Sequence, residues 1–333
     1  MANRLKAVLV GSDTLLGREV RDLVATSVPS LDLRLIAAEG EQAGTLTRQG
    51  EEPTVVEELT AENLADASIV FLAGSSDSTR KALELSGDSV SIIDLTYAAE
   101  ERPDARLRAP MIESGSDLDG ATVHVIADPA AIALALFLRR LQTNDPIRRC
   151  VIDVLAPASE RGASGVEELQ NQTVSLLSFK KMPRNIFDAQ LSFNLLARLG
   201  EEAPVALEET ELRIERHLAT LLSLPGDGED APMPSLRVIQ APVFHGYSFS
   251  AWVQFESSPG TEAIESSLAA GAIEVRSSEF DPPSNVGQAG QSGIAVGAIA
   301  PDRNDAEACW FWIVADNLRL LAENAVAVAK EIA

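Results

Sequence analysis

Cysteine, histidine and positive charge are scarce in this 333-residue sequence. Its two cysteines, Cys150 and Cys309, each lie at the edge of an expected strand, which predicts buried, inert thiols rather than a disulfide framework. The three histidines, His124, His217 and His245, are too scattered along the chain to predict a metal site. Lys and Arg total 27 against 50 Asp and Glu, so the formal net charge is −23. This balance argues against nucleic acid and anionic membranes as partners, because phosphate contacts need clusters of Lys and Arg.

Long apolar runs are also absent from the sequence. No segment approaches the roughly 20 apolar residues that a membrane-spanning helix needs, and the first residues lead into a strand without the apolar core of a signal peptide. We therefore expect a cytoplasmic protein with no membrane partner. The composition, 46% hydrophobic and 23% charged, is typical of a folded chain long enough for two domains.

The first part of the chain alternates short apolar runs with segments of helical spacing. Strands are expected over residues 5–10, 31–37, 68–72, 91–95 and 122–126. Strands separated by helices predict a parallel sheet with helices on both faces. The sequence therefore predicts the α/β class, with a doubly wound domain of the nucleotide-binding type at the N-terminus.

Beyond Pro129 the pattern changes to longer helices and grouped strands. Helices are expected over 130–141, 165–177 and 208–222, and strands over 150–155, 236–240, 248–255, 294–299 and 308–314. Such grouping favours a mixed or antiparallel sheet in a second, α+β domain. A last helix over 317–332 carries an apolar face, which predicts that it packs against a large surface.

A loop with two glycines follows the first expected strand and opens the first expected helix, which is the context of a dinucleotide-binding fingerprint. It reads Gly11-Ser12-Asp13-Thr14-Leu15-Leu16-Gly17. Thr14 replaces the middle glycine, so a side chain stands where a pyrophosphate would approach, and Asp13 adds a negative charge. The N–H groups of the helix start remain, so the anion site is weakened rather than abolished. A tight turn that needs glycine only for its geometry is an equally good interpretation.

Several collinear motifs connect the sequence with a known family. They are Gly165-Val166-Glu167-Glu168-Leu169-Gln170-Asn171-Gln172-Thr173, Gln190-Leu191-Ser192-Phe193-Asn194, Ala241-Pro242-Val243-Phe244-His245-Gly246-Tyr247-Ser248, Asn285-Val286-Gly287 and Ala315-Asp316-Asn317-Leu318-Arg319. Together with the glycine loop, they resemble the aspartate-semialdehyde dehydrogenase superfamily, and the chain is identified as a divergent member.

The resemblance implies two domains. The first, residues 1–130 plus 315–333, would be a Rossmann-type domain for NAD or NADP. The second, residues 131–314, would carry the catalytic floor and the homodimer interface on a mixed sheet, like the C-terminal domain of glyceraldehyde-3-phosphate dehydrogenase.

The resemblance also locates the family's catalytic positions, and none of them carries its usual residue. The family's Ala-Asn-Pro-Asn-Cys-Ser-Thr corresponds to Ala127 to Ala133 here, so the nucleophilic cysteine is Ala131. A methyl group can neither attack a carbonyl nor leave as a thiolate. The neighbours Ala130, Ile132 and Ala133 supply no hydroxyl or thiol in its place.

The other groups of the family's site are replaced as well. By the resemblance, the family's glutamine is Ala156, its substrate arginine is Gln240 and its base histidine is Tyr247. Tyrosine, with an ordinary pKa near 10, is a poor base at neutral pH. His245, two residues earlier, would share a strand face with Tyr247 and is the one plausible substitute base. The phosphate-binding arginine aligns near Glu100, and a lysine of the family aligns with Glu211.

These losses leave two functions open. The first is a non-catalytic dimer, a pseudoenzyme that keeps the fold with weak or no nucleotide binding. The second is an active oxidoreductase that uses NAD or NADP on the aldehyde or oxo group of a different small molecule. Gly11, Gly17, Gly74 and Asn317 match cofactor-contacting positions and support the second function. Glu39, about 20 residues beyond the loop, could accept a ribose hydroxyl and would favour NAD over NADP.

Overall fold

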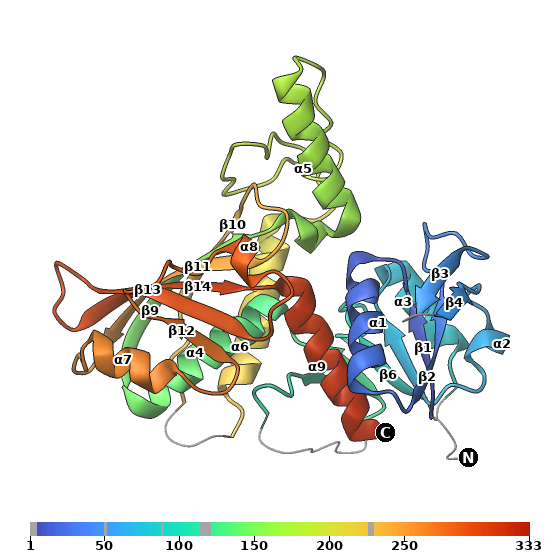
Figure 1. Cartoon of the computed structure of the whole chain (residues 1–333), viewed down its shortest axis with the longest axis horizontal. Helices are drawn as coiled ribbons and strands as arrows, with labels where there is room; N and C mark the ends of the chain where they lie inside the picture. The colour runs from blue at the N-terminus through green and yellow to red at the C-terminus, as the bar shows by residue number, and fades with distance from the viewer. Residues whose placement is uncertain (1–4, 50–51, 88–89, 114–120, 226–229) are drawn as a thin grey trace. The chain divides into compact units, whose positions relative to one another are not determined.

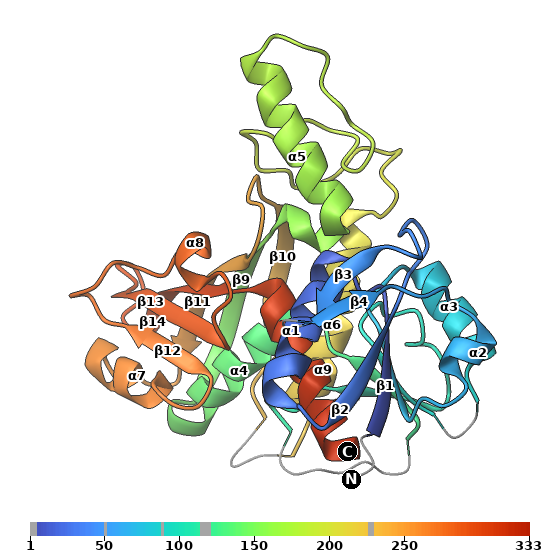
Figure 2. The same cartoon turned by 45° about the vertical axis from the view of Figure 1, so that its right-hand side comes forward.

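The structure is a computed structural model that describes residues 5–49, 52–87, 90–113, 121–225 and 230–333. Its internal contacts divide the chain into two compact units, Met1–Ala127 with Leu321–Ala333, and Asp128–Leu320 (Figures 1 and 2). We call them the first and the second unit. The functional domains expected over 1–130 with 315–333 and over 131–314 stay a prediction.

The first unit contains a six-stranded sheet in which every pairing is parallel. Its order is β2 (Leu31–Ile36), β1 (Leu5–Val10), β5 (Ile69–Leu72), β6 (Ser91–Asp94), β8 (Val123–Ile126) and β7 (Ala105–Arg108). The helices are α1 (Leu15–Ser27), α2 (Ala61–Leu64), α3 (Ser76–Leu85) and the later part of α9 (Asn317–Ile332). The α/β class and the doubly wound sheet are confirmed.

The strands that the sequence did not predict are short and polar. They are β7, with the residues Ala-Arg-Leu-Arg, and the hairpin of β3 (Leu46–Gln49) and β4 (Glu52–Val55). The five predicted strands, in contrast, are apolar runs that the sheet buries. Apolar periodicity therefore locates the core strands of this unit and misses its edges.

The second unit contains a mixed six-stranded sheet. Its order is β10 (Ser235–Gln240), β9 (Ile147–Ala156), β11 (Tyr247–Phe255), β14 (Ala308–Ala315), β13 (Ile294–Pro301) and β12 (Ile273–Arg276). The helical elements are α4 (Pro129–Asn144), a 3-10 turn (Ala158–Arg161), α5 (Gly162–Leu177), α6 (Leu207–Leu222), α7 (Thr261–Leu268) and α8 (Asn285–Gln288). Helices α4 and α6 contact each other and strands of this sheet. Helix α5 and the segment that follows it project away from the sheet of their own unit (Figures 1 and 2). We call residues 162–200 the arm.

The two cysteines lie inside strands rather than at their edges, and both are buried and free. Each stands opposite Val253, Cys150 on β9 and Cys309 on β14, with β11 between them. Two strand spacings of about 4.8 Å exceed the roughly 7 Å limit between the Cα atoms of a disulfide. Burial raises the pKa of Cys150 to about 12. The prediction of buried cysteines without a disulfide is therefore confirmed.

Among the residues that the structure describes, no helix is both long and apolar enough to cross a membrane.

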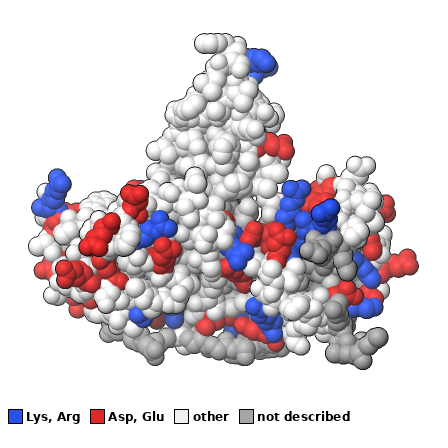
Figure 3. All heavy atoms as spheres, in the orientation of Figure 1, with Lys and Arg blue, Asp and Glu red and all other residues white. Residues whose placement is uncertain are grey.

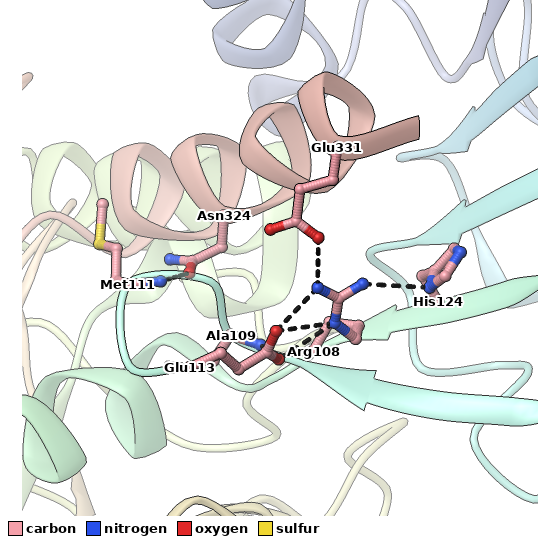
Figure 4. A network of polar contacts seen from close by, with 7 residues as sticks. All are labelled: Arg108, Ala109, Met111, Glu113, His124, Asn324 and Glu331. Atoms are coloured by element: carbon pink, nitrogen blue, oxygen red, sulfur yellow. Dashed lines mark hydrogen bonds and ion pairs between the residues drawn. The ribbon is translucent and has the colours of Figure 1, made fainter. Parts of the chain in front are cut away.

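A buried ion-pair network ties the end of α9 to the first unit's sheet (Figure 4). Arg108, fully buried at the end of β7, donates to Glu113 at 2.7 Å and to Glu331 of α9 at 2.6 Å. Glu113 also accepts the N–H of Ala109 at 2.7 Å. The ring of His124 lies on the other side of the guanidinium, 3.5 Å from it. The guanidinium is therefore paired with two carboxylates on one side and faces the buried ring of His124 on the other.

This arrangement predicts an acid-sensitive fold. Burial and the charges of Arg108 and Arg106 lower the pKa of His124 from 6.5 to about 4. The unfolded chain therefore binds more protons between pH 6.5 and 4, so this stability is complete above pH 6.5 and is lost as the pH falls towards 4. The full effect is on the order of 3 kcal/mol. Urea titrations at pH 7, 5.5 and 4.5 measure the free energy of unfolding of wild type and His124→Asn. Because the variant has no imidazole to protonate, its free energy of unfolding should fall less steeply with decreasing pH. An equally steep fall in both proteins would contradict the role assigned to His124.

Candidate functional site

Ala131, the family's nucleophile position, lies in the first turn of α4 and is fully buried. Asp128 caps this helix by accepting the N–H of Ala130 at 2.9 Å, and Pro129 follows as the first helical residue. Ala130, Ile132 and Ala133 are fully buried too. A cavity of about 450 Å³ in the second unit lies elsewhere, beside the start of α6. The side chain at this position is therefore a buried methyl group without contact with solvent.

A buried charged cluster, formed by Asp128, Glu160 and Arg213, lies at the start of α4. Arg213 on α6 donates to Asp128 at 3.1 Å and to Glu160 at 3.0 Å. The Asp128 side chain is fully buried and that of Glu160 is 9% exposed. His217, one turn along α6, accepts the N–H of Asp128 at 2.8 Å. One guanidinium thus pairs with two carboxylates of its own chain, which leaves it no free charge for a substrate anion.

Tyr247, at the family's base position, begins β11 and is fully buried. Its ring stacks on Phe249 with the centroids 5.7 Å apart. Burial, with the charges of Glu160 and Asp128, raises the pKa of Tyr247 well above its ordinary value. Burial and Asp128 also raise the pKa of Glu160. Tyr247 therefore stays a neutral phenol at neutral pH and cannot take up a proton.

The expectation that His245 shares a strand face with Tyr247 is wrong. His245 lies in the turn before β11, and Gly246 between the two has a φ of +83°. The left-handed glycine changes the chain direction, so strand alternation does not relate the two side chains.

Ala156 and Gln240 are brought together as register partners at the ends of β9 and β10. The fully buried Gln240 donates its amide N–H to the Ala156 carbonyl at 2.8 Å. Glu211, aligned with the family's lysine, accepts the N–H of Val238 at 2.7 Å and so ties α6 to β10. The side chains of Gln240 and Glu211 are therefore both hydrogen-bonded to backbone groups of the chain.

Asn317, a predicted cofactor contact, is bonded within the second unit. Its side-chain oxygen accepts from the Ser159 hydroxyl at 3.1 Å and from the Gly246 N–H at 3.0 Å. Glu100 lies in the turn after β6, which Asp94 organises by accepting the N–H groups of Thr96 and Ala99 at 2.7 and 2.8 Å. Burial raises the pKa of Asp94.

The glycine loop of the first unit is packed against the loop after β5. Gly11 has a φ of +87°, and a Cβ there would lie 2.5 Å from the Cα of Gly74. A Cβ on Gly17 would overlap the Gly11 carbonyl. Thr14 caps α1 by accepting the Gly17 N–H at 2.9 Å, and its hydroxyl lies 2.8 Å from the Ala73 carbonyl. Each glycine therefore has a geometric reason to be there without a ligand.

Glu39 is exposed in the turn after β2, and the acid that contacts the loop is Glu41. The Asp13 N–H donates to the Glu41 carboxylate at 3.0 Å, and Asp13 also pairs with Arg21 at 3.5 Å. Sequence reasoning missed Glu41, Arg213 and Glu160. The only signal available was the spacing of Arg213 and His217, four residues apart on one helix face.

Comparison with known proteins identifies the family. The semialdehyde dehydrogenase dimerisation domain matches residues 138–320, more than half of the chain. The chain belongs to the semialdehyde dehydrogenase family. An aspartate-semialdehyde dehydrogenase of Rickettsia bellii is 26% identical over 100% of this chain and 98% of its own. A USG-1 protein homolog of Pseudomonas aeruginosa is 28% identical over 96% and 94%.

Solved structures of the family share the fold. The aspartate semialdehyde dehydrogenase II of Vibrio cholerae, complexed with ASA, superposes with a TM-score of 0.84 at 20% identity, over 99% of this chain and 98% of that one. The Candida albicans enzyme, solved with NADP, gives a TM-score of 0.66 at 16% identity, over 99% and 98%. That Candida albicans enzyme thus binds NADP.

The family's Gly-x-x-Glu-Leu-x-x-Gln-Thr motif on α5 holds the arm together. Glu168 accepts the N–H groups of Ile186 and Phe187 at 2.9 and 3.1 Å. Gln172 accepts those of Leu191 and Ser192 at 2.8 and 3.1 Å. The motif of residues 165–173 therefore binds the motif of residues 190–194 to α5. This structural role does not involve the family's reaction.

The buried cluster makes Arg213 a strong determinant of stability. Arg213→Met leaves two buried carboxylates without their cation, which should cost about 3–5 kcal/mol. Arg216→Met, the same change on the exposed side of α6, should change the free energy of unfolding by less than about 0.5 kcal/mol. Urea titration of both variants measures the difference. Equal stabilities would show that the cluster is solvated.

Proposed function

We propose that this chain is a non-catalytic, homodimeric member of the aspartate-semialdehyde dehydrogenase superfamily, a pseudoenzyme that does not reduce aspartyl phosphate. The observation that carries the proposal is the fully buried Ala131 next to the closed Asp128–Arg213–Glu160 cluster. The family's reaction needs a thiolate, a base and cations for the substrate's anionic groups. Here these positions hold a methyl group, a neutral phenol and side chains bonded to the chain's own backbone.

The size of the loss supports inactivity rather than a slower enzyme. In a triad protease, removing one member of the covalent catalytic set costs roughly a millionfold in rate. This chain lacks nucleophile, base and substrate arginine together. Restoring one of them therefore leaves the others missing.

We further propose that NAD and NADP bind weakly or not at all. Thr14 and Asp13 occupy the place of the loop's middle residues, and the Thr14 hydroxyl is engaged with backbone groups of the first unit. The alternative function is an oxidoreductase that acts on the aldehyde or oxo group of another small molecule. It is supported by relatives of this chain that are semialdehyde dehydrogenases.

A direct assay separates the two functions. Wild type and Ala131→Cys are mixed with NADP or NAD, phosphate and aspartate semialdehyde, then with a panel of other aldehydes, and reduced cofactor is followed by absorbance. We expect no turnover from either protein, while a family dehydrogenase with its cysteine serves as the positive control. Turnover of any aldehyde by wild type would contradict the proposal that the protein is non-catalytic. Turnover by Ala131→Cys alone would show that base and anion sites survive.

Two observations support the proposed homodimer: the match of residues 138–320 to a dimerisation domain, and the apolar surface of the arm within this range. The arm exposes large apolar side chains, with Leu177 71%, Phe179 98% and Phe193 67% exposed. In Figure 3 the arm surface, at the top, is nearly free of charged groups, in contrast to the surface below it. A second copy of the chain would cover these side chains, since exposed apolar patches of this kind mark interfaces.

Replacing two arm residues tests the dimer. Leu177→Asp with Phe193→Asp should convert a dimer into a monomer in sedimentation velocity runs at micromolar concentration. Leu46→Asp, at a 72% exposed position on β3 of the first unit, is the control and should leave the dimer intact. A monomeric wild type, or a double variant that stays dimeric, contradicts this role for the arm.

A further inference from the structure

We infer that the carboxylate of Glu41 is a resident anion that closes the glycine loop of the first unit to phosphate groups. This inference rests on the proposed weak nucleotide binding and names its cause. It concerns a residue outside the predicted loop, two positions beyond Glu39.

The geometry of Glu41 is that of a bound anion. One carboxylate oxygen accepts the Asp13 N–H at 3.0 Å, and the other accepts the Ala38 N–H at 2.8 Å. The turn that presents Glu41 is itself closed, because the Glu41 N–H donates to the Ala38 carbonyl at 3.1 Å. The side chain thus bridges the loop after β2 and the loop after β1.

Four further amide groups of the loop, those of Gly11, Ser12, Thr14 and Gly17, are also engaged within the first unit. Gly11 and Ser12 donate to the Ile36 carbonyl at 2.9 and 3.4 Å, and Thr14 donates to Gly11 at 3.2 Å. Gly17 donates to the Thr14 hydroxyl. A dinucleotide loop binds pyrophosphate through such N–H groups. In this loop Asp13 and these four residues already have acceptors for their N–H groups.

Charge adds to this closure. Burial raises the pKa of Glu41, and the neighbouring charge of Asp13 adds to the rise, while the amides of Ala38 and Asp13 oppose it. An incoming phosphate would meet both carboxylates, and the nearby cation, Arg21, is shared with Asp13. The residues present therefore do not fit the phosphates of NAD or NADP.

The test uses 2′,5′-ADP, an adenosine with phosphates at both positions, as the calorimetric probe. Glu41→Gln removes the charge at the loop, and Glu39→Gln removes one charge at an exposed position two residues away. We expect Glu41→Gln to bind the probe at least tenfold more tightly than wild type, with Glu39→Gln unchanged. Equal affinities for the two variants, or tight binding by wild type, would overturn the inference.

A second measurement needs no variant. In hydrogen exchange of the wild-type protein, the Asp13 and Ala38 amides should be protected, and rapid exchange at both would also overturn the inference, whether or not Glu41→Gln folds. The result of these Glu41 tests can be distinguished from the result of the aldehyde assay that tests the proposed function. Failure here, with wild type still inactive towards aldehydes, leaves the non-catalytic role standing, whereas hydride transfer by wild type removes that role directly.

Discussion

The ion pairs of Arg213 with Asp128 and Glu160 constrain the region around the start of α4, where the sequence analysis places the family's catalytic positions. Buried charges are costly unless they are paired, so the start of α4, the turn after β9 and α6 are held together by one guanidinium. Ala131 lies one turn along α4 from Asp128. A thiol at that position would be buried, and burial in apolar surroundings raises the pKa of a thiol.

Retention of the family's other motifs has a separate physical reason. Glu168 and Gln172 hold the long segment after α5 through hydrogen bonds to its backbone, and this role is independent of the reaction. Gly11, Gly17 and Gly74 remain because side chains there would collide with their neighbours. The contacts that hold the fold, the arm and the loop geometry therefore do not depend on the residues at the predicted nucleophile, base and anion positions.

Sequence reasoning located the buried strands, because their apolar runs are local patterns, and it recognised the family from its collinear motifs. It missed β7 and the β3–β4 hairpin, whose short polar runs carry no apolar period. The contacts that close the two sites join residues far apart, 85 positions for Arg213 with Asp128 and 28 for Asp13 with Glu41. No spacing rule predicts such pairs. The strand face expected for His245 was wrong because Gly246, a left-handed glycine, separates it from Tyr247. The ribose contact expected of Glu39 stays a prediction.

The most direct test of a closed site is the reactivity of a thiol placed in it. In a background of Cys150→Ala and Cys309→Ala, Ala131→Cys is treated with a disulfide reagent that releases a coloured thiolate. The buried position predicts no reaction in the native protein and full reaction in urea. Val174→Cys, at a 54% exposed position of α5, sets the rate of an accessible thiol. If Cys at position 131 reacts natively at that same rate, the site is open to solvent and its closure by the Arg213 cluster is contradicted.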